Sequence, residues 1–153
     1  SGSLKLPRGL MDWNFSKSFS ESGEKPKYLL VADDVIGGYF ALNGGSLGNN
    51  IGKIYYYSSK DLTWHNLNFT YTEFLAWALN GDVEEYYKGI YWKNWQDDVK
   101  QLDGNQVFVF TPDLNQDRKI AIDERQKQEV NIETHYQANF AEKNKFDLAY
   151  SVA

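Results

Sequence analysis

Residues 113–124 (DLNQDRKIAIDE) have a spacing of oxygen-bearing side chains that is typical of a calcium-binding EF-hand loop. Carboxylate or amide residues occupy the first, third, fifth and last positions of that pattern: Asp113, Asn115, Asp117 and Glu124. The sixth position, where the loop turns sharply and favours glycine, is Arg118, and the preceding VFVFTP favours a strand over an entering helix. The sequence therefore predicts a solvated polar loop, with no metal and no cofactor, and leaves a calcium site as the alternative.

Asp33 and Asp34 form an adjacent pair of carboxylates that could in principle do acid–base chemistry. They follow an apolar run, YLLVA, which is typical of a strand buried on both faces. Adjacent side chains of a strand point to opposite faces, so the two carboxylates could not share a proton. We expect them instead to cap the turn after the strand.

The remaining candidates for catalysis form no recognisable constellation. His65 and His135 lie far apart, with no serine or acidic motif that pairs with them. The glycines between positions 37 and 52 fit neither a dinucleotide-binding nor a phosphate-binding loop. The absence of cysteine excludes disulfides, thiolate zinc sites and thiol nucleophiles. The sequence thus names no catalytic residue, and an enzyme is the least favoured class.

Composition limits the classes of partner. The 153 residues carry 16 basic and 21 acidic side chains, a net charge of −5, and no basic cluster, which disfavours binding to nucleic acid or to an anionic membrane. No apolar stretch is long enough to span a bilayer, and no export signal is present, so the sequence predicts a cytoplasmic protein. The length favours a single domain covering residues 1–153.

The elements that would position these residues follow from patterning. Four strands are predicted at residues 28–33, 39–42, 53–57 and 62–68, and their short connections favour antiparallel pairing. A helix is predicted over residues 70–81, because Thr70 and Glu73 have the spacing of a capping box and Gly81 follows as a stop. Its apolar face would consist of Tyr71, Phe74, Leu75, Ala78 and Leu79.

The rest of the chain has weaker signals. Two short helices are predicted at 83–88 and 94–101, a sheet strand at 106–111 and an edge pairing at 120–122, with a mostly helical segment from residue 123. Residues 1–27 would be an irregular arm tacked down by Met11, Trp13, Phe15 and Phe19, residues 28–111 the core, and residues 112–153 a loop with a helical end. The fold class is α+β, an antiparallel or mixed sheet of about five strands covered by helices on one side.

Several segments resemble the bacterial domain-of-unknown-function family 2625 (DUF2625): LPRGLMDWN, LLVADDVIGGYFALNGGSLG, GKIYYY, LTWHNLN, YTEFLAWALNGD and YYKGIYWKNW. The match covers about two-thirds of the chain and fades beyond Val107. The order of strands followed by the EFL helix is also similar to the SUKH superfamily, many of whose members are immunity proteins that neutralise a toxin. The resemblance implies no catalytic residues, because the family has none assigned.

The leading prediction is a non-enzymatic protein-binding module, such as a SUKH-like immunity protein, whose partner would be another protein; the acidic balance of the chain would suit a basic one. The predicted contact residues belong to a glycine-rich loop and an aromatic turn: Asn43, Gly44, Gly45, Tyr91, Trp92 and Trp95. The alternative is a small-molecule or carbohydrate-binding domain that uses exposed aromatic side chains. A flat exposed patch would favour the protein partner, and a concave pocket with a few polar groups would favour the ligand.

Overall fold

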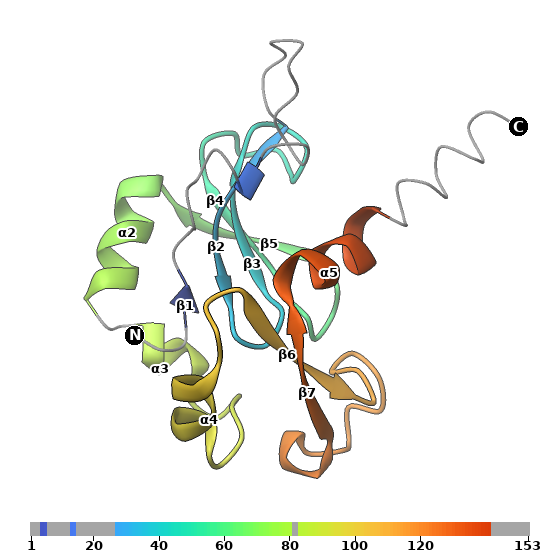
Figure 1. Ribbon diagram of the computed structural model, residues 1–153. Helices are drawn as coiled ribbons and strands as arrows, with labels where there is room; N and C mark the ends of the chain where they lie inside the picture. The colour runs from blue at the N-terminus through green and yellow to red at the C-terminus, as the bar shows by residue number, and fades with distance from the viewer. Residues whose placement is uncertain (1–3, 6–12, 15–26, 81–82, 142–153) are drawn as a thin grey trace, which may run out of the picture.

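The computed structural model describes residues 4–5, 13–14, 27–80 and 83–141. Its main element is a five-stranded sheet in which each strand pairs antiparallel with the next in sequence (Figure 1). The strands are β1 (Leu4–Lys5), β2 (Tyr28–Asp34), β3 (Tyr39–Asn43), β4 (Ile54–Tyr57) and β5 (Trp64–Phe69). With the helices that pack on the sheet, this confirms the α+β class and the antiparallel pairing that the short connections predicted.

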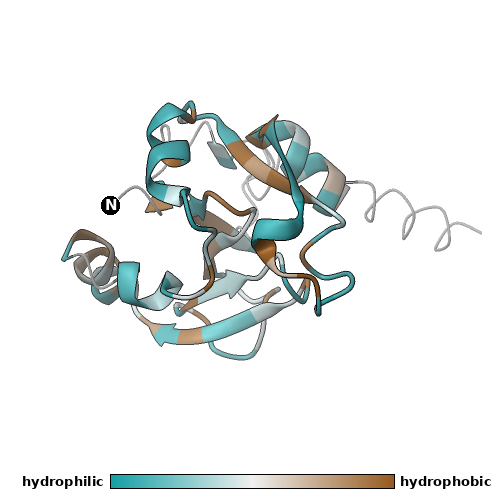
Figure 2. Cartoon of the chain, turned by 90° about the horizontal axis from the view of Figure 1, so that it is seen from below, coloured by the Kyte–Doolittle hydropathy of each residue, from teal (hydrophilic) through white to brown (hydrophobic). Residues whose placement is uncertain are grey.

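The sheet is covered on both faces, which the sequence predicted for one face only. All four residues of β4 are buried, and their side chains alternate between two hydrophobic clusters. Tyr56 packs in the cluster that contains Phe74, whereas Tyr57 packs in the cluster that contains Tyr136. Figure 2 shows hydrophobic residues interleaved with hydrophilic ones along the chain.

The first face is covered by α2 (Tyr71–Leu79) and α3 (Val83–Tyr87), with α4 (Trp95–Gln101) following. The predicted capping box is confirmed, since the Glu73 amide donates to Thr70 Oγ1 and the Thr70 amide donates to Glu73 Oε1, both at 3.2 Å. Phe74 and Ala78 form the buried stripe of α2. Leu79, predicted on that stripe, is 71% exposed, because a nine-residue helix reaches the core through one narrow face.

The second sheet is a hairpin of β6 (Gln106–Thr111) and β7 (Gln126–Asn131). Residues 106–111 were correctly predicted as a strand, but they pair with β7 and not with the main sheet. The predicted edge pairing at 120–122 is wrong, because the pairing strand begins at Gln126 and a 3-10 helix, η1 (Ile122–Glu124), precedes it. The amide of Phe108 donates to the carbonyl of Val35 at 2.9 Å, which docks the hairpin on the β2–β3 turn.

The second face of the main sheet is covered by α5 (Ile132–Tyr136) and the π-helix η2 (Gln137–Ala141), beside the hairpin in Figure 1. In the N-terminal arm, Trp13 is 4% exposed and packs in the same cluster, as predicted. Met11, Phe15 and Phe19 lie outside the described residues. Within the described ranges, none of the helices has both the length and the apolar character needed to cross a bilayer.

Phe74→Ala should lower the free energy of unfolding by roughly 3–5 kcal/mol, because a fully buried aromatic side chain would be replaced by a cavity. Leu79→Ala is the matched control on the same helix and should change stability by less than about 0.5 kcal/mol, since Leu79 is exposed. Urea denaturation of both variants measures the two values. Equal losses would show that α2 faces the sheet differently.

Candidate functional site

Asp34 ends strand β2 and is fully buried. Its Oδ1 accepts hydrogen bonds from the backbone amides of Ile36 (3.1 Å) and Gly38 (2.6 Å), which confirms its predicted role as a cap for the following turn. Its Oδ2 accepts hydrogen bonds from the hydroxyls of Tyr56 (2.6 Å) and Tyr87 (2.7 Å). Burial raises the pKa of this carboxyl, and the four hydrogen bonds oppose that shift by stabilising the charged form.

Asp33 serves different partners from Asp34. Its Oδ2 lies 3.2 Å from Lys5 Nζ, and this ion pair ties β1 to the edge of β2. The ammonium of Lys5 also donates to the carbonyl of Gln106 at the start of β6. Neither carboxylate is placed to exchange a proton with the other, so this pair supports the fold.

The turn that Asp34 caps brings distant parts of the chain together at Gly37. This residue has φ +89°, a conformation that favours glycine. A Cβ at Gly37 would lie 2.8 Å from Cε1 and Nε2 of His135, and 3.7 Å from the Cβ of Ser59. The missing side chain of Gly37 thus allows His135 and Ser59 to approach the same turn.

Ser59 lies in the tight connection between β4 and β5. The turn is closed by bonds to Ser58: the amide of Leu62 donates to its carbonyl at 2.8 Å, and the amide of Lys60 donates to its Oγ at 3.1 Å. The Ser59 hydroxyl takes part in neither bond. Ser59 Oγ is buried and makes no hydrogen bond to any residue that the structure describes. A buried hydroxyl without a partner is unfavourable by about 1–3 kcal/mol, which is the usual mark of a site completed by water or a ligand.

The loop between β6 and β7 is built around Arg125, which is 8% exposed. Its guanidinium donates to five backbone carbonyls at 2.7–3.1 Å: those of Pro112, Asp113, Gln116, Asp117 and Ile120. These oxygens surround a positive charge much as a cation-binding loop surrounds its ion, and the guanidinium fork satisfies them. The acidic spacing at 113–124 therefore reflects a loop folded around an arginine, and no group of three or more potential metal ligands occurs among the described residues.

His135 lies on helix α5, whose start is capped by Asn131 Oδ1 accepting from the amide of Glu133 at 2.9 Å. The imidazole stacks on the ring of Tyr39 with centroids 5.7 Å apart, and Nδ1 lies 2.6 Å from the Tyr39 hydroxyl oxygen. Burial lowers the pKa of His135 from its ordinary 6.5 to about 4, although Asp113 opposes this shift. His135 is therefore neutral at physiological pH.

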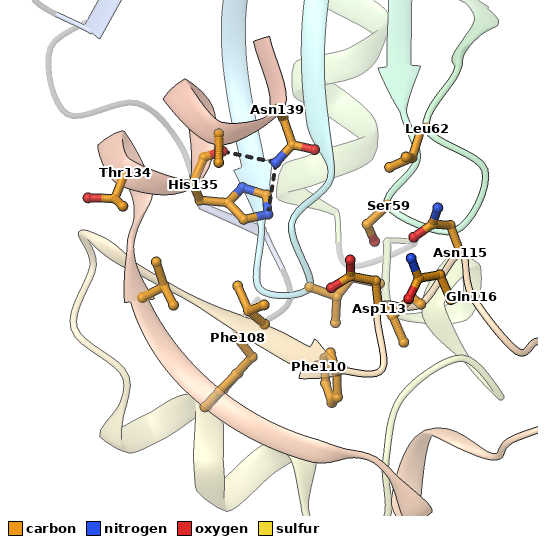
Figure 3. A pocket seen from close by; sticks show the side chains of 15 residues that line it. Ser59, Leu62, Phe108, Phe110, Asp113, Asn115, Gln116, Thr134, His135 and Asn139 are labelled. Atoms are coloured by element: carbon orange, nitrogen blue, oxygen red, sulfur yellow. Dashed lines mark hydrogen bonds between the residues drawn. The ribbon is translucent and has the colours of Figure 1, made fainter. Parts of the chain in front are cut away.

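These elements enclose a pocket of about 480 Å³, which we call the His135 pocket (Figure 3). His135 and Asn139 face Ser59 and Asp113 across the hollow, and Phe108 and Phe110 lie below them. Its lining is completed by apolar side chains and a few polar ones: Ile36, Leu62, Val109, Leu114, Asn115, Gln116, Val130, Thr134 and Ala138. The pocket thus combines apolar walls with several converging hydrogen-bonding groups, the composition of a small-molecule site.

The pocket lacks the geometry of nucleophilic catalysis. Ser59 Oγ has no hydrogen bond to His135 within the described residues, and His135 Nδ1 contacts Tyr39 where a triad would place a carboxylate. His65, the other histidine, is exposed and pairs with Asp61 at 2.6 Å on the surface. The arrangement can bind and orient a molecule, and it offers no activated nucleophile.

The predicted contact loop at 43–50 is organised by Asn43, which is 1% exposed. Its Oδ1 accepts from the amides of Gly45 and Leu47, and its Nδ2 donates to two further loop carbonyls. Its side chain holds the loop from within, which disfavours the contact role predicted for Asn43. Gly44 and Gly45 are exposed and stay predicted contact residues.

The predicted aromatic turn is split by burial. Trp92 is 5% exposed, packs against Phe108 and Phe110, and donates from Nε1 to Asp98 at 2.6 Å, which disfavours the contact role predicted for it. Tyr91 and Trp95 are half-buried and line a shallow hollow of about 490 Å³, so they stay predicted contact residues. Figure 1 shows this region at the opposite end of the molecule from the β3–β4 loop, so the two predicted halves do not form one site.

The family described as protein of unknown function DUF2625 matches residues 1–135, most of the chain. The chain belongs to this family. Over 153 residues it is 95% identical to an uncharacterized protein of Haemophilus influenzae, covering all of this chain and 67% of that protein. Over 114 residues it is 40% identical to the uncharacterized protein YbfG of Escherichia coli K12, covering 74% of this chain and 51% of that protein. No solved structure matches.

This member of DUF2625 therefore spans about two thirds and about half of these two relatives. The family match reaches from the N-terminal arm to His135 and so includes Ser59 and the whole β6–β7 loop. Asn139 follows His135 by one helical turn, a spacing that could have pointed to the pair from sequence. No local signal marks Ser59.

Arg125→Met should lower the free energy of unfolding by about 3 kcal/mol or more, because five backbone carbonyls would lose a charged donor. Arg118→Met is the matched control, since that exposed guanidinium donates to the carbonyl of Lys60, and the loss of this bond should shift stability by less than about 1 kcal/mol. Millimolar calcium should leave the melting temperature of the wild type unchanged. A rise with calcium that Glu124→Gln abolishes would restore the calcium hypothesis.

Acid should destabilise the protein through His135. The unfolded chain takes up a proton near pH 6.5 and the folded chain only near pH 4, so this contribution to stability is present above pH 6.5 and is lost as the pH falls toward 4. Between pH 7 and 5 the loss should be on the order of 2 kcal/mol, and His135→Asn should lack it. Urea denaturation at both pH values measures the difference, with His65→Asn as the control that removes an exposed imidazole. The same pH dependence in wild type and His135→Asn would contradict the assignment.

Proposed function

We propose that this DUF2625 protein is a small-molecule-binding domain and that the His135 pocket is its binding site. The observation that carries the proposal is the convergence of polar side chains from separate elements, His135, Asn139 and Asp113, on one hollow with apolar walls. Such a combination is typical of a small-molecule site. The pocket also has a volume within the range of ligand sites.

Preorganisation of the walls supports the same function. Each polar side of the pocket is held by its own internal contacts: Arg125 fixes the loop that carries Asp113, and Tyr39 fixes the ring of His135. Gly37 fixes the approach of the two sides to each other. Rigid walls lower the entropy lost on binding, because few side chains remain to be ordered.

A carbohydrate is a less suitable ligand than a compact molecule. Sugar binding through exposed aromatic faces was the form in which this alternative was predicted, and no Tyr or Trp occurs among the described residues that line the pocket. Its aromatic residues, Phe108 and Phe110, are each 3% exposed and belong to the core. The site therefore offers an apolar surface with hydrogen-bonding groups at its rim.

Protein binding stays a prediction for the surface at Tyr91 and Trp95. Of the six contact residues predicted for a protein partner, two are buried, and the other four are divided between opposite ends of the molecule. The large exposed hydrophobic residues of the described chain lie elsewhere: Ile51, Tyr71, Leu79 and Tyr86. The geometry thus favours the pocket over a partner surface.

A thermal-shift screen of the wild type against a library of small metabolites should give compounds that raise the melting temperature, because a ligand that binds only the folded state stabilises it. Ala138→Trp, which places an indole at the pocket wall, should abolish the shift given by each such compound. Ala76→Trp is the control, as an exposed alanine of α2 that does not line the pocket. Shifts that persist in Ala138→Trp, or no shifts in the wild type, would contradict the proposal.

A further inference from the structure

We propose that the His135 pocket takes a small organic amine in its protonated form, with the ammonium group beside Asp113 and a compact apolar body against Leu62 and Val130. This inference rests on the proposed binding function of the pocket and adds the chemical class of the ligand.

Charge is the first argument. Of the described residues that line the pocket, Asp113 alone carries a charge at neutral pH, because His135 is neutral there. Lys5 acts electrostatically on His135, and its ammonium is engaged by Asp33 and by the carbonyl of Gln106. Lys60 and Arg118 line a separate hollow of about 520 Å³, beyond Leu114. The His135 pocket therefore has a single negative charge with no lysine or arginine on its wall, which favours a cation over an anion.

Hydrogen-bond polarity is the second argument. Asn139 Nδ2 donates to the backbone carbonyl of His135 at 2.9 Å, which orients the amide so that its NH₂ group also points at His135 Nε2, 3.4 Å away. A neutral imidazole has one N–H, and the NH₂ group of Asn139 beside Nε2 favours the tautomer in which Nε2 accepts and Nδ1 donates to the hydroxyl oxygen of Tyr39. The Nε2 contact is long, and this lone pair is available to a stronger donor.

Acceptors therefore face the pocket from two opposite walls. Asp113 contributes carboxylate oxygens, His135 contributes Nε2, and Ser59 Oγ can accept as well as donate. An ammonium group has three donors and no acceptor, so it matches this set, whereas a carboxylate or phosphate would face acceptors and a like charge. Figure 3 shows these groups around one hollow.

The apolar walls define the rest of the ligand. Leu62, Val109 and Val130 are partly exposed and provide apolar surface that a hydrocarbon body can cover, and a volume of about 480 Å³ limits that body to a compact one. Aromatic or branched aliphatic amines meet both requirements. Polyamines and nucleosides would leave polar groups against these apolar walls.

Three isosteric probes separate charge from shape: benzylamine, benzyl alcohol and benzoate. Isothermal titration calorimetry at pH 7.5 should give benzylamine a dissociation constant at least about tenfold lower than that of benzyl alcohol, with benzoate weakest, since a charged hydrogen bond adds roughly this factor. Asp113→Asn should weaken benzylamine about tenfold and leave benzyl alcohol unchanged.

Asp117→Asn is the matched control, because it removes the same charge from the same loop without lining the pocket, and asparagine tolerates its φ of 46°. Benzylamine should bind this variant as it binds the wild type. Equal affinity for the three probes, equal losses in the two variants, or no binding of benzylamine would overturn the amine assignment. The proposed binding function fails separately, if the metabolite library gives no ligand that Ala138→Trp excludes.

Discussion

The buried carboxylate of Asp34 is the constraint on which the rest of the structure depends. An isolated charge inside a protein is unfavourable by several kcal/mol, so the groups that bond to it are held in place by the need to stabilise it. Those groups come from the β2–β3 turn, strand β4 and helix α3. The same turn receives the β6 hairpin through Val35 and approaches His135 through Gly37. The core and the pocket therefore share one anchor.

Local signals allowed much of the main sheet and its first helix to be predicted from sequence. The capping box of α2 and the runs that became β2 to β5 depend on neighbours within a few residues. Strand β7 has no such signal, because QKQEVN is polar and mostly exposed, and it is a strand because it pairs with β6. Tertiary pairing decided its structure, and the helix expected there was wrong for that reason.

The pocket was predictable only in fragments. The sequence identified Asp113 and Asn115 as possible oxygen ligands of a calcium ion, and His135 as an isolated histidine. Their common site depends on Arg125, whose partners are backbone carbonyls, and any residue type supplies a carbonyl. Ser59 and Asn139 reach the pocket from two further elements that no spacing rule connects. Asn43 and Trp92 were chosen by residue type, which indicates capacity for contact, whereas burial decides whether a side chain is available, and both are buried.

Arg125 also provides donors to carbonyls of the β6–β7 loop without a metal ion. A loop that folds around a metal ion is ordered only where the ion is abundant, and a chelator can take the ion away. A guanidinium belongs to the chain, stays protonated at every physiological pH and cannot exchange with solvent ions. The loop therefore contains the hydrogen-bond donors that its own carbonyls need. Its wall of the pocket keeps one shape in dilute and concentrated salt alike.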